Sequence, residues 1–362
     1  MKRTLQTKAC LYLLSACLGG AQITMAANAT PDLPKVVVLS TGGTIAGESM
    51  SSTDTSNYQA GKRSGAELLK AVPEIATIAD ITVEQVNNVS SPNLLYTDLL
   101  TLAHATNKHL QDPEVAGVVI THGTSTAEET AMFLDLTVPT GKPVVVVGAM
   151  RPATAISADG PLNLLQAVAL ASNPAAKGRG VLLMSNDRIS SALYTSKTHS
   201  LALDTFQAQD QGHLGMMVGD QAYFYYAPAL PTGKPYFDIS NTTALPKVDI
   251  VYGYVENDTG IVDYLVERGT QGLVIAAPGN SSLSSTMLSK VQQLHEKKYP
   301  VVRATRTGAG VVTPKKEGIA AGFYNPQKAR LLLALALNDK ATTEQISQYF
   351  FPFQKSLTLA AH

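Results

Sequence analysis

Three short clusters in the sequence combine hydroxyl, glycine and lysine residues in a way that suits attack on a carbonyl group. They are Ser40–Gly47, Thr121–Thr130 and Ser196–Thr198. A threonine hydroxyl can attack a carbonyl carbon when a neighbouring group takes its proton, and a lysine with a lowered pKa can be that group. The glycines let backbone N–H groups approach a ligand closely. These clusters are therefore candidates for hydroxyl-based catalysis.

Each cluster also has a plainer interpretation. The glycines before Thr44 are consistent with a tight turn or a weak phosphate loop, although the P-loop lysine and the G-x-G-x-x-G spacing are missing. Ser125 and Thr126 are ordinary helix N-cap residues. A single histidine such as His122 is typically a hydrogen-bonded structural residue, and a single lysine such as Lys197 is typically solvated. The residue types alone leave these alternatives open.

Each cluster directly follows a segment that is predicted to be a strand. The predicted strands are nearly all apolar, as strands buried on both faces of a parallel sheet are. They span Lys35–Ser40, Ile81–Val89, Gly117–Thr121, Pro143–Ala149, Gly180–Met184, Val248–Tyr254, Leu273–Ala277 and Val301–Thr305.

Helical patterns lie between these strands. Ser64 with Glu67 and Ser125 with Glu128 have the spacing of capping boxes, and Asp159 is placed to cap a helix with Pro161 in its first turn. Further helices are predicted over Thr97–Leu110, Gly260–Arg268, Ser284–Lys298 and Gln327–Leu337.

The alternation of strands and helices predicts an α/β fold with two doubly wound parallel-sheet domains, a larger N-terminal one and a smaller C-terminal one. The proline-rich stretch 224–247 is interpreted as a hairpin followed by a linker. We divide the chain into a signal peptide (1–29), an N-terminal domain with the reactive residues (30–225), a linker (226–247) and a C-terminal domain (248–355). The site is expected at the carboxyl ends of the strands.

The first 29 residues have the features of a secretory signal. They hold three basic residues and no acid, an apolar run and an Ala27-Asn28-Ala29 cleavage site, so export to the periplasm is expected. The alternative is a lipoprotein signal that ends at Cys17. Both cysteines lie in this leader, so the mature chain would have neither a disulfide nor a thiol nucleophile.

Composition excludes some functions. The mature chain would carry 25 basic and 28 acidic residues, a net charge near −3, and it has no basic run and no tryptophan, which disfavours nucleic-acid binding. No later segment is long and apolar enough to span a membrane. The seven histidines show no metal-binding spacing, so no metal site is predicted.

Several motifs, in order along the chain, resemble the bacterial type II (periplasmic) asparaginase and glutaminase-asparaginase family. The similarity runs from about Lys35 to Phe350, and its motifs are Thr41–Gly47, Thr121–Thr124, Met150–Pro152, Ser157–Gly160, Asn186–Asp187, Ser196–Thr198, Pro278–Asn280 and Asn325–Arg330.

The resemblance implies hydrolysis of the side-chain carboxamide of asparagine or glutamine to the acid and ammonia. Thr44 would form an acyl-enzyme, Tyr58 would orient and activate it, and Thr124 with Lys197 would move protons and position water. The substrate would be bound by Ser91, Ser125, Gly43, Gly123 and Ser282. The resemblance also implies that no cofactor is needed and that the chain forms a homotetramer.

The sequence departs from the family at the end of the site that binds the substrate amine. The family has Asp where this chain has Ser125, and a longer acidic loop where it has the short stretch 307–324. Pro92 replaces a polar residue after Ser91, and Ser282 stands where asparagine-preferring members have Asn. These departures motivate one alternative, an amidase for an amine-blocked or altered carboxamide. A second alternative, which the secretory signal, the chain length and the two α/β domains suit equally, is a periplasmic binding protein without catalytic activity.

Overall fold

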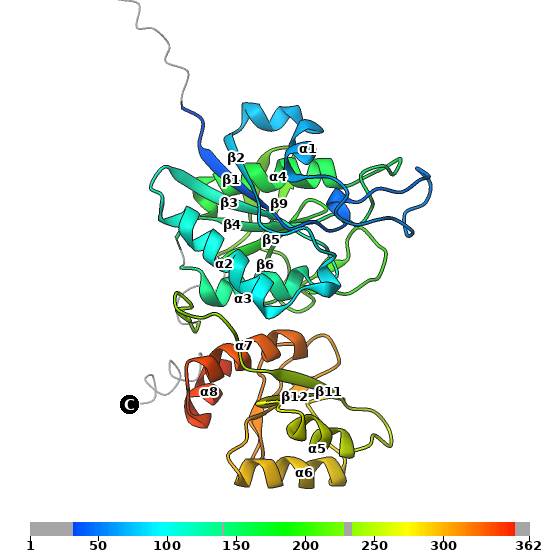
Figure 1. The fold of residues 1–362 in the computed structure, drawn as a ribbon, viewed down its shortest axis with the longest axis vertical. Coiled ribbons are helices and arrows are strands. Elements are labelled where there is room, and N and C mark those ends of the chain that lie inside the picture. Colours follow the sequence, from blue (N-terminus) through cyan, green and yellow to red (C-terminus); the bar gives the residue numbers. More distant parts are fainter. Residues whose placement is uncertain (1–31, 140, 228–233, 352–362) are drawn as a thin grey trace, which may run out of the picture. The chain divides into compact units, whose positions relative to one another are not determined.

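The computed structural model describes residues 32–139, 141–227 and 234–351. The predicted signal peptide, its cleavage site and Cys17 lie outside the described residues. Within them the chain is an α/β protein with a larger N-terminal and a smaller C-terminal domain, each built on its own sheet (Figure 1). The predicted fold class is therefore confirmed. None of the helices in the described ranges combines the length and hydrophobicity that crossing a bilayer requires.

Within the described residues, the N-terminal sheet has eight strands in the order β10-β9-β6-β5-β4-β3-β1-β2. The pairs β5-β4, β4-β3, β3-β1 and β1-β2 are parallel. The pairs β10-β9, β9-β6 and β6-β5 are antiparallel. The strands are β1 (Lys35–Ser40), β2 (Asp80–Gln85), β3 (Val115–Thr121), β4 (Val144–Val147), β5 (Val181–Ser185), β6 (Arg188–Ser191), β9 (Gly215–Val218) and β10 (Gln221–Phe224).

A two-residue turn explains why the sheet becomes antiparallel after β5. Asn186 and Asp187 adopt positive φ values of 50° and 62°. Two consecutive residues with positive φ form the tight turn that best matches the twist of a hairpin, and Asn and Asp tolerate this conformation better than most residues. The chain therefore folds back on β5 as β6 instead of crossing over as a helix.

Helices cover both faces of this sheet because successive residues of a strand point to opposite sides. In β1, Val37 and Leu39 pack in one buried cluster with α2 (Tyr96–Gln111) and α3 (Ala127–Thr137). Val36 and Val38 pack in another cluster with α1 (Gly65–Lys70) and α4 (Gly160–Ser172), on the other face (Figure 1). Short 3₁₀ turns lie at Thr44–Ala46, Pro73–Thr77, Ser91–Asn93 and Pro174–Ala176.

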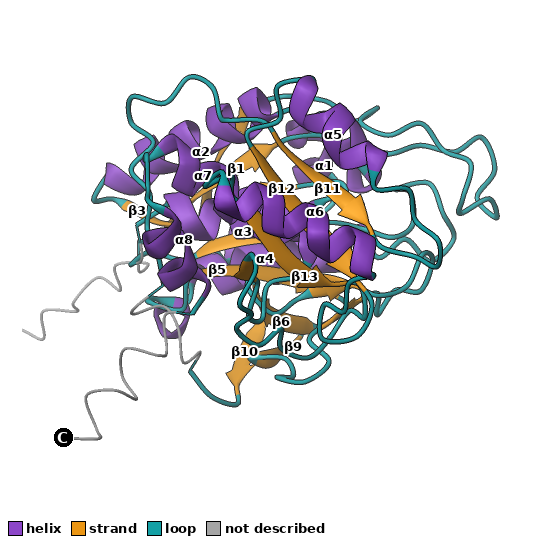
Figure 2. Cartoon of the chain, turned by 90° about the horizontal axis from the view of Figure 1, so that it is seen from below, coloured by secondary structure: helices purple, strands orange, loops and turns teal. Residues whose placement is uncertain are grey.

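The C-terminal sheet is parallel, with the order β11-β12-β13-β14. Helices α5 and α6 pack against one of its faces and α7 against the other, so this domain also has three layers (Figure 2). The elements are β11 (Val248–Tyr252), α5 (Gly260–Glu267), β12 (Gly272–Ala277), α6 (Ser285–Glu296), β13 (Val301–Thr305), β14 (Ile319–Ala320), α7 (Pro326–Asn338) and α8 (Thr343–Phe350). A separate two-stranded sheet pairs β7 (Ser196–Lys197) with β8 (Phe206–Gln207).

One predicted cap is confirmed and two are wrong. Ser64 and Glu67 form the expected capping box of α1. Helix α3 instead begins after Thr126, without a side-chain cap. Glu128, the expected partner of Ser125, has its carboxylate bonded to Asn325 and Gln327 of the C-terminal domain. Asp159 likewise does not cap α4, because its carboxylate accepts the backbone N–H groups of Met150 and Arg151.

Candidate active site

The predicted reactive residues lie where the strand order of the N-terminal sheet reverses. The chain passes from β1 outward to β2 and then returns to the other side of β1 as β3. In open α/β sheets, ligands bind at this reversal, beyond the carboxyl ends of the strands. Ser40 and Thr121, the last residues of β1 and β3, are paired neighbours. Thr44 follows Ser40 by four residues, and Thr124 follows Thr121 by three.

Two glycines let the segments after β1 and β3 touch. Gly43 has a positive φ of 86°, and a Cβ atom built on it would lie 2.3 Å from the backbone nitrogen of Gly123. A Cβ on Gly123 would lie 2.6 Å from Oγ of Ser91. Only residues without a side chain can make this double approach. The residues 43, 91 and 123, which were predicted to bind substrate, therefore lie in one close group.

Thr44 is hydrogen-bonded to Tyr58. Thr44 Oγ1 and the Tyr58 hydroxyl are 2.6 Å apart, and the Thr44 side chain is buried. Tyr58 belongs to a segment that leaves Gly47 and returns alongside it, with backbone hydrogen bonds in both directions between Glu48 and Gln59. A phenol at this distance can hold the threonine hydroxyl in one rotamer and share its proton.

Lys197 and Thr124 form a second polar pair. Lys197 Nζ donates a hydrogen bond of 2.8 Å to Thr124 Oγ1. Burial lowers the pKa of Lys197, while the negative charge of Glu128 acts in the opposite direction. A lysine whose pKa is lowered is a better proton acceptor near neutral pH. The pair therefore combines a hydroxyl with a group that can exchange its proton.

Backbone donors are also present beside the two threonines. Among the described residues, the N–H groups of Thr44 and Thr124 find no hydrogen-bond acceptor. Unpaired N–H groups next to a reactive hydroxyl are suited to hold the negative oxygen of a tetrahedral intermediate.

Other predicted residues lie in different surroundings. Ser91 is buried, and its carbonyl accepts a 3.0 Å hydrogen bond from Thr126 Oγ1. Ser125 is exposed and carries no charge. The contacts of Ser282 lie within its own loop after β12, where its N–H donates to Pro278. Within the described residues, Ser282 has no hydrogen bond to Thr44, Tyr58, Thr124 or Lys197.

His122 is a structural residue here. It is fully buried, and its ring bonds to the Gly123 carbonyl through Nδ1 (2.7 Å) and to the Thr130 hydroxyl through Nε2 (2.9 Å). Burial lowers its pKa to about 4. A neutral ring with a proton on Nδ1 satisfies both bonds, because a carbonyl can only accept. His122 therefore fixes the segment that carries Thr124.

Sequence reasoning did not bring Glu128, Asn325 and Lys328 together. These residues form a polar cluster beside Lys197, in which Glu128 and Lys328 are buried and Asn325 is partly buried. The sequence contains a sign of this cluster, because Asn325 and Lys328 both belong to the Asn325–Arg330 motif. Within the described ranges, His, Cys, Asp and Glu residues nowhere gather in threes in a way that could hold a metal ion.

The fold and the site define a two-domain α/β protein with a hydroxyl-based site at the strand-order reversal of its larger domain. Residues 35–230 match the family described as asparaginase, N-terminal, and residues 247–350 match the glutaminase/asparaginase C-terminal domain. The chain belongs to the asparaginase family and is an amidohydrolase. The alternative of a binding protein without catalytic activity is thereby disfavoured.

Individual relatives agree with this assignment. L-asparaginase 2 of Bacillus subtilis is 45% identical over 329 residues, which cover 90% of this chain and 88% of the relative. A probable periplasmic L-asparaginase of Haemophilus influenzae is 41% identical, covering 90% and 95% of the two chains. The crystal structure of a probable cytoplasmic L-asparaginase from Campylobacter jejuni has a TM-score of 0.85 and 44% identity, covering 88% of this chain and 99% of that one.

Proposed function

We propose that this amidohydrolase cleaves the side-chain carboxamide of L-asparagine, L-glutamine or both, through an acyl-enzyme on Thr44. One observation carries the proposal: Thr44 Oγ1 lies 2.6 Å from the Tyr58 hydroxyl, in a segment that touches the one carrying Thr124, the hydrogen-bond partner of Lys197. A nucleophile bonded to a proton-sharing group, with a second proton-exchanging pair nearby, is the arrangement that covalent hydrolysis needs.

The reaction then runs in two balanced steps. Thr44 Oγ1 attacks the carboxamide carbon, its proton passes by way of Tyr58 to the departing nitrogen, and ammonia leaves as the ester forms. A water molecule, deprotonated by the Lys197–Thr124 pair, attacks the ester carbon, and the proton returns to Thr44 as the acid is released. The backbone N–H groups of Thr44 and Thr124 hold the oxyanion in both steps.

The buried Ser91 hydroxyl, beside Gly43 and Gly123, would bind the α-carboxylate of the substrate. Ser282 would contact the side-chain end of the substrate only if it came from another copy of the chain, because the contacts of Ser282 within one chain lie in the loop after β12. We therefore propose a homotetramer, as the family resemblance implies, and sedimentation or solution scattering that shows a stable monomer would remove this proposal.

Ammonia release from asparagine and glutamine tests the reaction. Thr44→Ala should lower kcat at least about 1,000-fold, because the nucleophile is lost. Thr44→Ser, which keeps the hydroxyl, should retain measurable activity and is the matched control. A reactive carboxamide analogue should add its acyl mass to wild-type protein on Thr44 only. A folded Thr44→Ala protein with the wild-type rate would refute the mechanism.

A second candidate is an amidase for a carboxamide whose α-amine is blocked. It is motivated by Ser125, which is exposed and uncharged at the position where the family has an amine-binding Asp. N-acylated asparagine should then be hydrolysed faster than the free amino acid. Turnover of the free amino acids at the rate of other members of the family would eliminate this candidate.

We further propose export to the periplasm and division of the chain at residues 30–225, 226–247 and 248–355. The basic and apolar pattern of residues 1–29 supports export, as does the similarity to the periplasmic relative from Haemophilus influenzae. Mass spectrometry of the protein recovered from a periplasmic extract would show whether the leader has been cut near Ala27–Ala29 or lipidated at Cys17.

A further inference from the structure

The first turn of α7 is hydrogen-bonded to the chain segment that leads into Lys197. The Lys328 ammonium is buried and donates to the carbonyl oxygens of Leu193 (2.9 Å) and Thr195. Asn325 Nδ2 donates to Ser196 Oγ at 3.0 Å. The three acceptors belong to residues four, two and one positions before Lys197, so the α7 contacts limit how far this segment can move.

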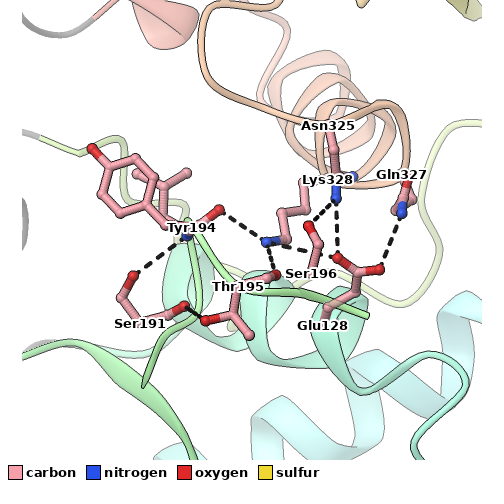
Figure 3. A network of polar contacts seen from close by, with 9 residues as sticks. Glu128, Ser191, Tyr194, Thr195, Ser196, Asn325, Gln327 and Lys328 are labelled. Atoms are coloured by element: carbon pink, nitrogen blue, oxygen red, sulfur yellow. Dashed lines mark hydrogen bonds and ion pairs between the residues drawn. The ribbon is translucent and has the colours of Figure 1, made fainter. Parts of the chain in front are cut away.

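The same turn of α7 also holds the segment that follows Thr124. Figure 3 shows the Glu128 carboxylate between Asn325 and Gln327, which donate to its two oxygens at 3.0 and 3.1 Å. Lys328 Nζ lies 3.8 Å from the same carboxylate. Glu128 is in the first turn of α3, four residues after Thr124. Both members of the Lys197–Thr124 pair are thus attached to one point on α7.

Stabilisation by the Lys328–Glu128 ion pair alone would not require Lys328 to bond to the 193–195 segment as well. A buried ion pair is a weak source of stability, because removing the two charges from water costs about as much as their attraction returns. Two of the Lys328 hydrogen bonds also go to carbonyl oxygens of the 193–195 segment and not to Glu128. The contacts instead define a geometry: they fix the 193–196 segment relative to the start of α3.

We propose that Asn325, Gln327 and Lys328, acting with Glu128, are positioning residues that set the Lys197–Thr124 contact. The inference rests on the proposed function, in which this pair moves the protons of the reaction. It assigns a role to the C-terminal domain, whose helix α7 would keep Lys197 and Thr124 of the N-terminal domain at hydrogen-bonding distance. It also gives the Asn325–Arg330 motif a physical purpose.

The electrostatic surroundings agree with this role. Burial lowers the pKa of Lys328 to about 8, and Glu128, Asp135 and Glu129 oppose that shift. Glu128 also opposes the lowering of the Lys197 pKa by burial. A single carboxylate therefore acts on both ammonium groups, in a chain where Ser125 contributes no charge.

Substitution of Lys328 by Met tests the proposal, with kcat and KM measured on whichever of asparagine and glutamine the wild type hydrolyses faster. Met keeps the length and apolar contacts of the side chain but removes its donors. We expect kcat to fall about 10- to 100-fold, the cost of a misplaced reacting group, with KM changed less than about threefold. Ser196→Ala, which loses only the Asn325 bond, should lower kcat about fivefold.

Lys234→Met is the matched control. Lys234 forms a buried ion pair with Asp135, at the far end of α3. The Lys234→Met substitution should lower the melting temperature as Lys328→Met does, while kcat per folded molecule stays at the wild-type value. A double Glu128→Gln, Lys328→Met variant should recover melting temperature, because no charge is left unpaired, but its kcat should remain low.

Wild-type kcat in folded Lys328→Met, or in Ser196→Ala if the first variant does not fold, would overturn the proposal. Full recovery of kcat in the double variant would do the same. Lys197→Met and Thr44→Ala separate this outcome from failure of the proposed function. If both are inactive while the α7 variants are fully active, only the positioning role is lost; an active Thr44→Ala protein would refute the proposed function itself.

Discussion

Ser125 is a position at which this chain differs from the residue that the family resemblance leads us to expect, which is Asp. It lies directly after Thr124, at the end of the site where a substrate ammonium group would be bound, and it is exposed and uncharged. A hydroxyl can accept a hydrogen bond but supplies no charge. Because hydrogen bonds to charged groups contribute about 1.5–3 kcal/mol, this one position can alter substrate preference strongly.

Replacing Ser125 by Asp should restore recognition of a free α-amine. We expect kcat/KM on asparagine or glutamine to rise about 10- to 150-fold, which corresponds to one charged hydrogen bond. Ser125→Asn, which adds a similar side chain without charge, should give little gain. N-acylated substrates should also show none, since they carry no ammonium group. Equal gains in the Asp and Asn variants would mean that side-chain size, and not charge, limits the reaction.

Motifs in the sequence identified the candidate reactive residues but not what surrounds them. Thr44, Thr124 and Lys197 each follow a strand or lie in a short polar motif, so their neighbourhood could be expected from local patterns. Glu128 could not be placed in this way, because a glutamate three residues after Ser125 has the spacing of a helix cap. Its actual partners, Asn325 and Gln327, are almost 200 residues further along the chain.

His122 joins the segment that follows β3 to the start of α3. The His122 ring connects the Gly123 carbonyl to Thr130, one turn inside the helix, so a single side chain bridges the segment that bears Thr124. Because the ring is fully buried, it is held neutral, with a pKa of about 4 against 6.5 for a solvated histidine. This bridge therefore makes part of the stability depend on pH.

Stability should decline as the pH falls from about 6.5 to 4. In this window the unfolded chain binds a proton at His122 that the folded chain does not bind, so protonation favours unfolding. The loss should reach about 3 kcal/mol at pH 4, since one pKa unit corresponds to about 1.4 kcal/mol. Urea denaturation of wild type and His122→Gln at several pH values measures it. The variant should lack this part of the slope; identical slopes would contradict the assignment.

Elements with long apolar patterns were predictable, and short ones were not. The bounds of β1 and β13 agree with the predicted ranges, and α2 differs by one residue at each end. Strands β7, β8 and β14 have two residues each, too few for a periodic pattern to emerge. They exist because of pairing with distant segments, as Ser196 pairs with Gln207.

The two domains share part of one hydrophobic core. Buried residues of α3, such as Phe133 and Leu136, belong to the same apolar cluster as Leu331 and Leu333 of α7. The described residues from Leu33 onward belong to one compact unit. The sequence predicted two domains correctly but gave no sign of the shared core, because the apolar face of a helix does not reveal which element covers it.

A shared core should make the whole molecule unfold in one step. Calorimetry at a fixed protein concentration should show a single transition, with calorimetric and van't Hoff enthalpies that agree. Leu170→Ala, on the buried side of α4 in the N-terminal domain, and Leu294→Ala, on the buried side of α6 in the C-terminal domain, should each cost about 2–5 kcal/mol. Both should move the same transition. If the domains unfolded separately, each variant would shift only the transition of its own domain, and a second peak would remain at the wild-type temperature.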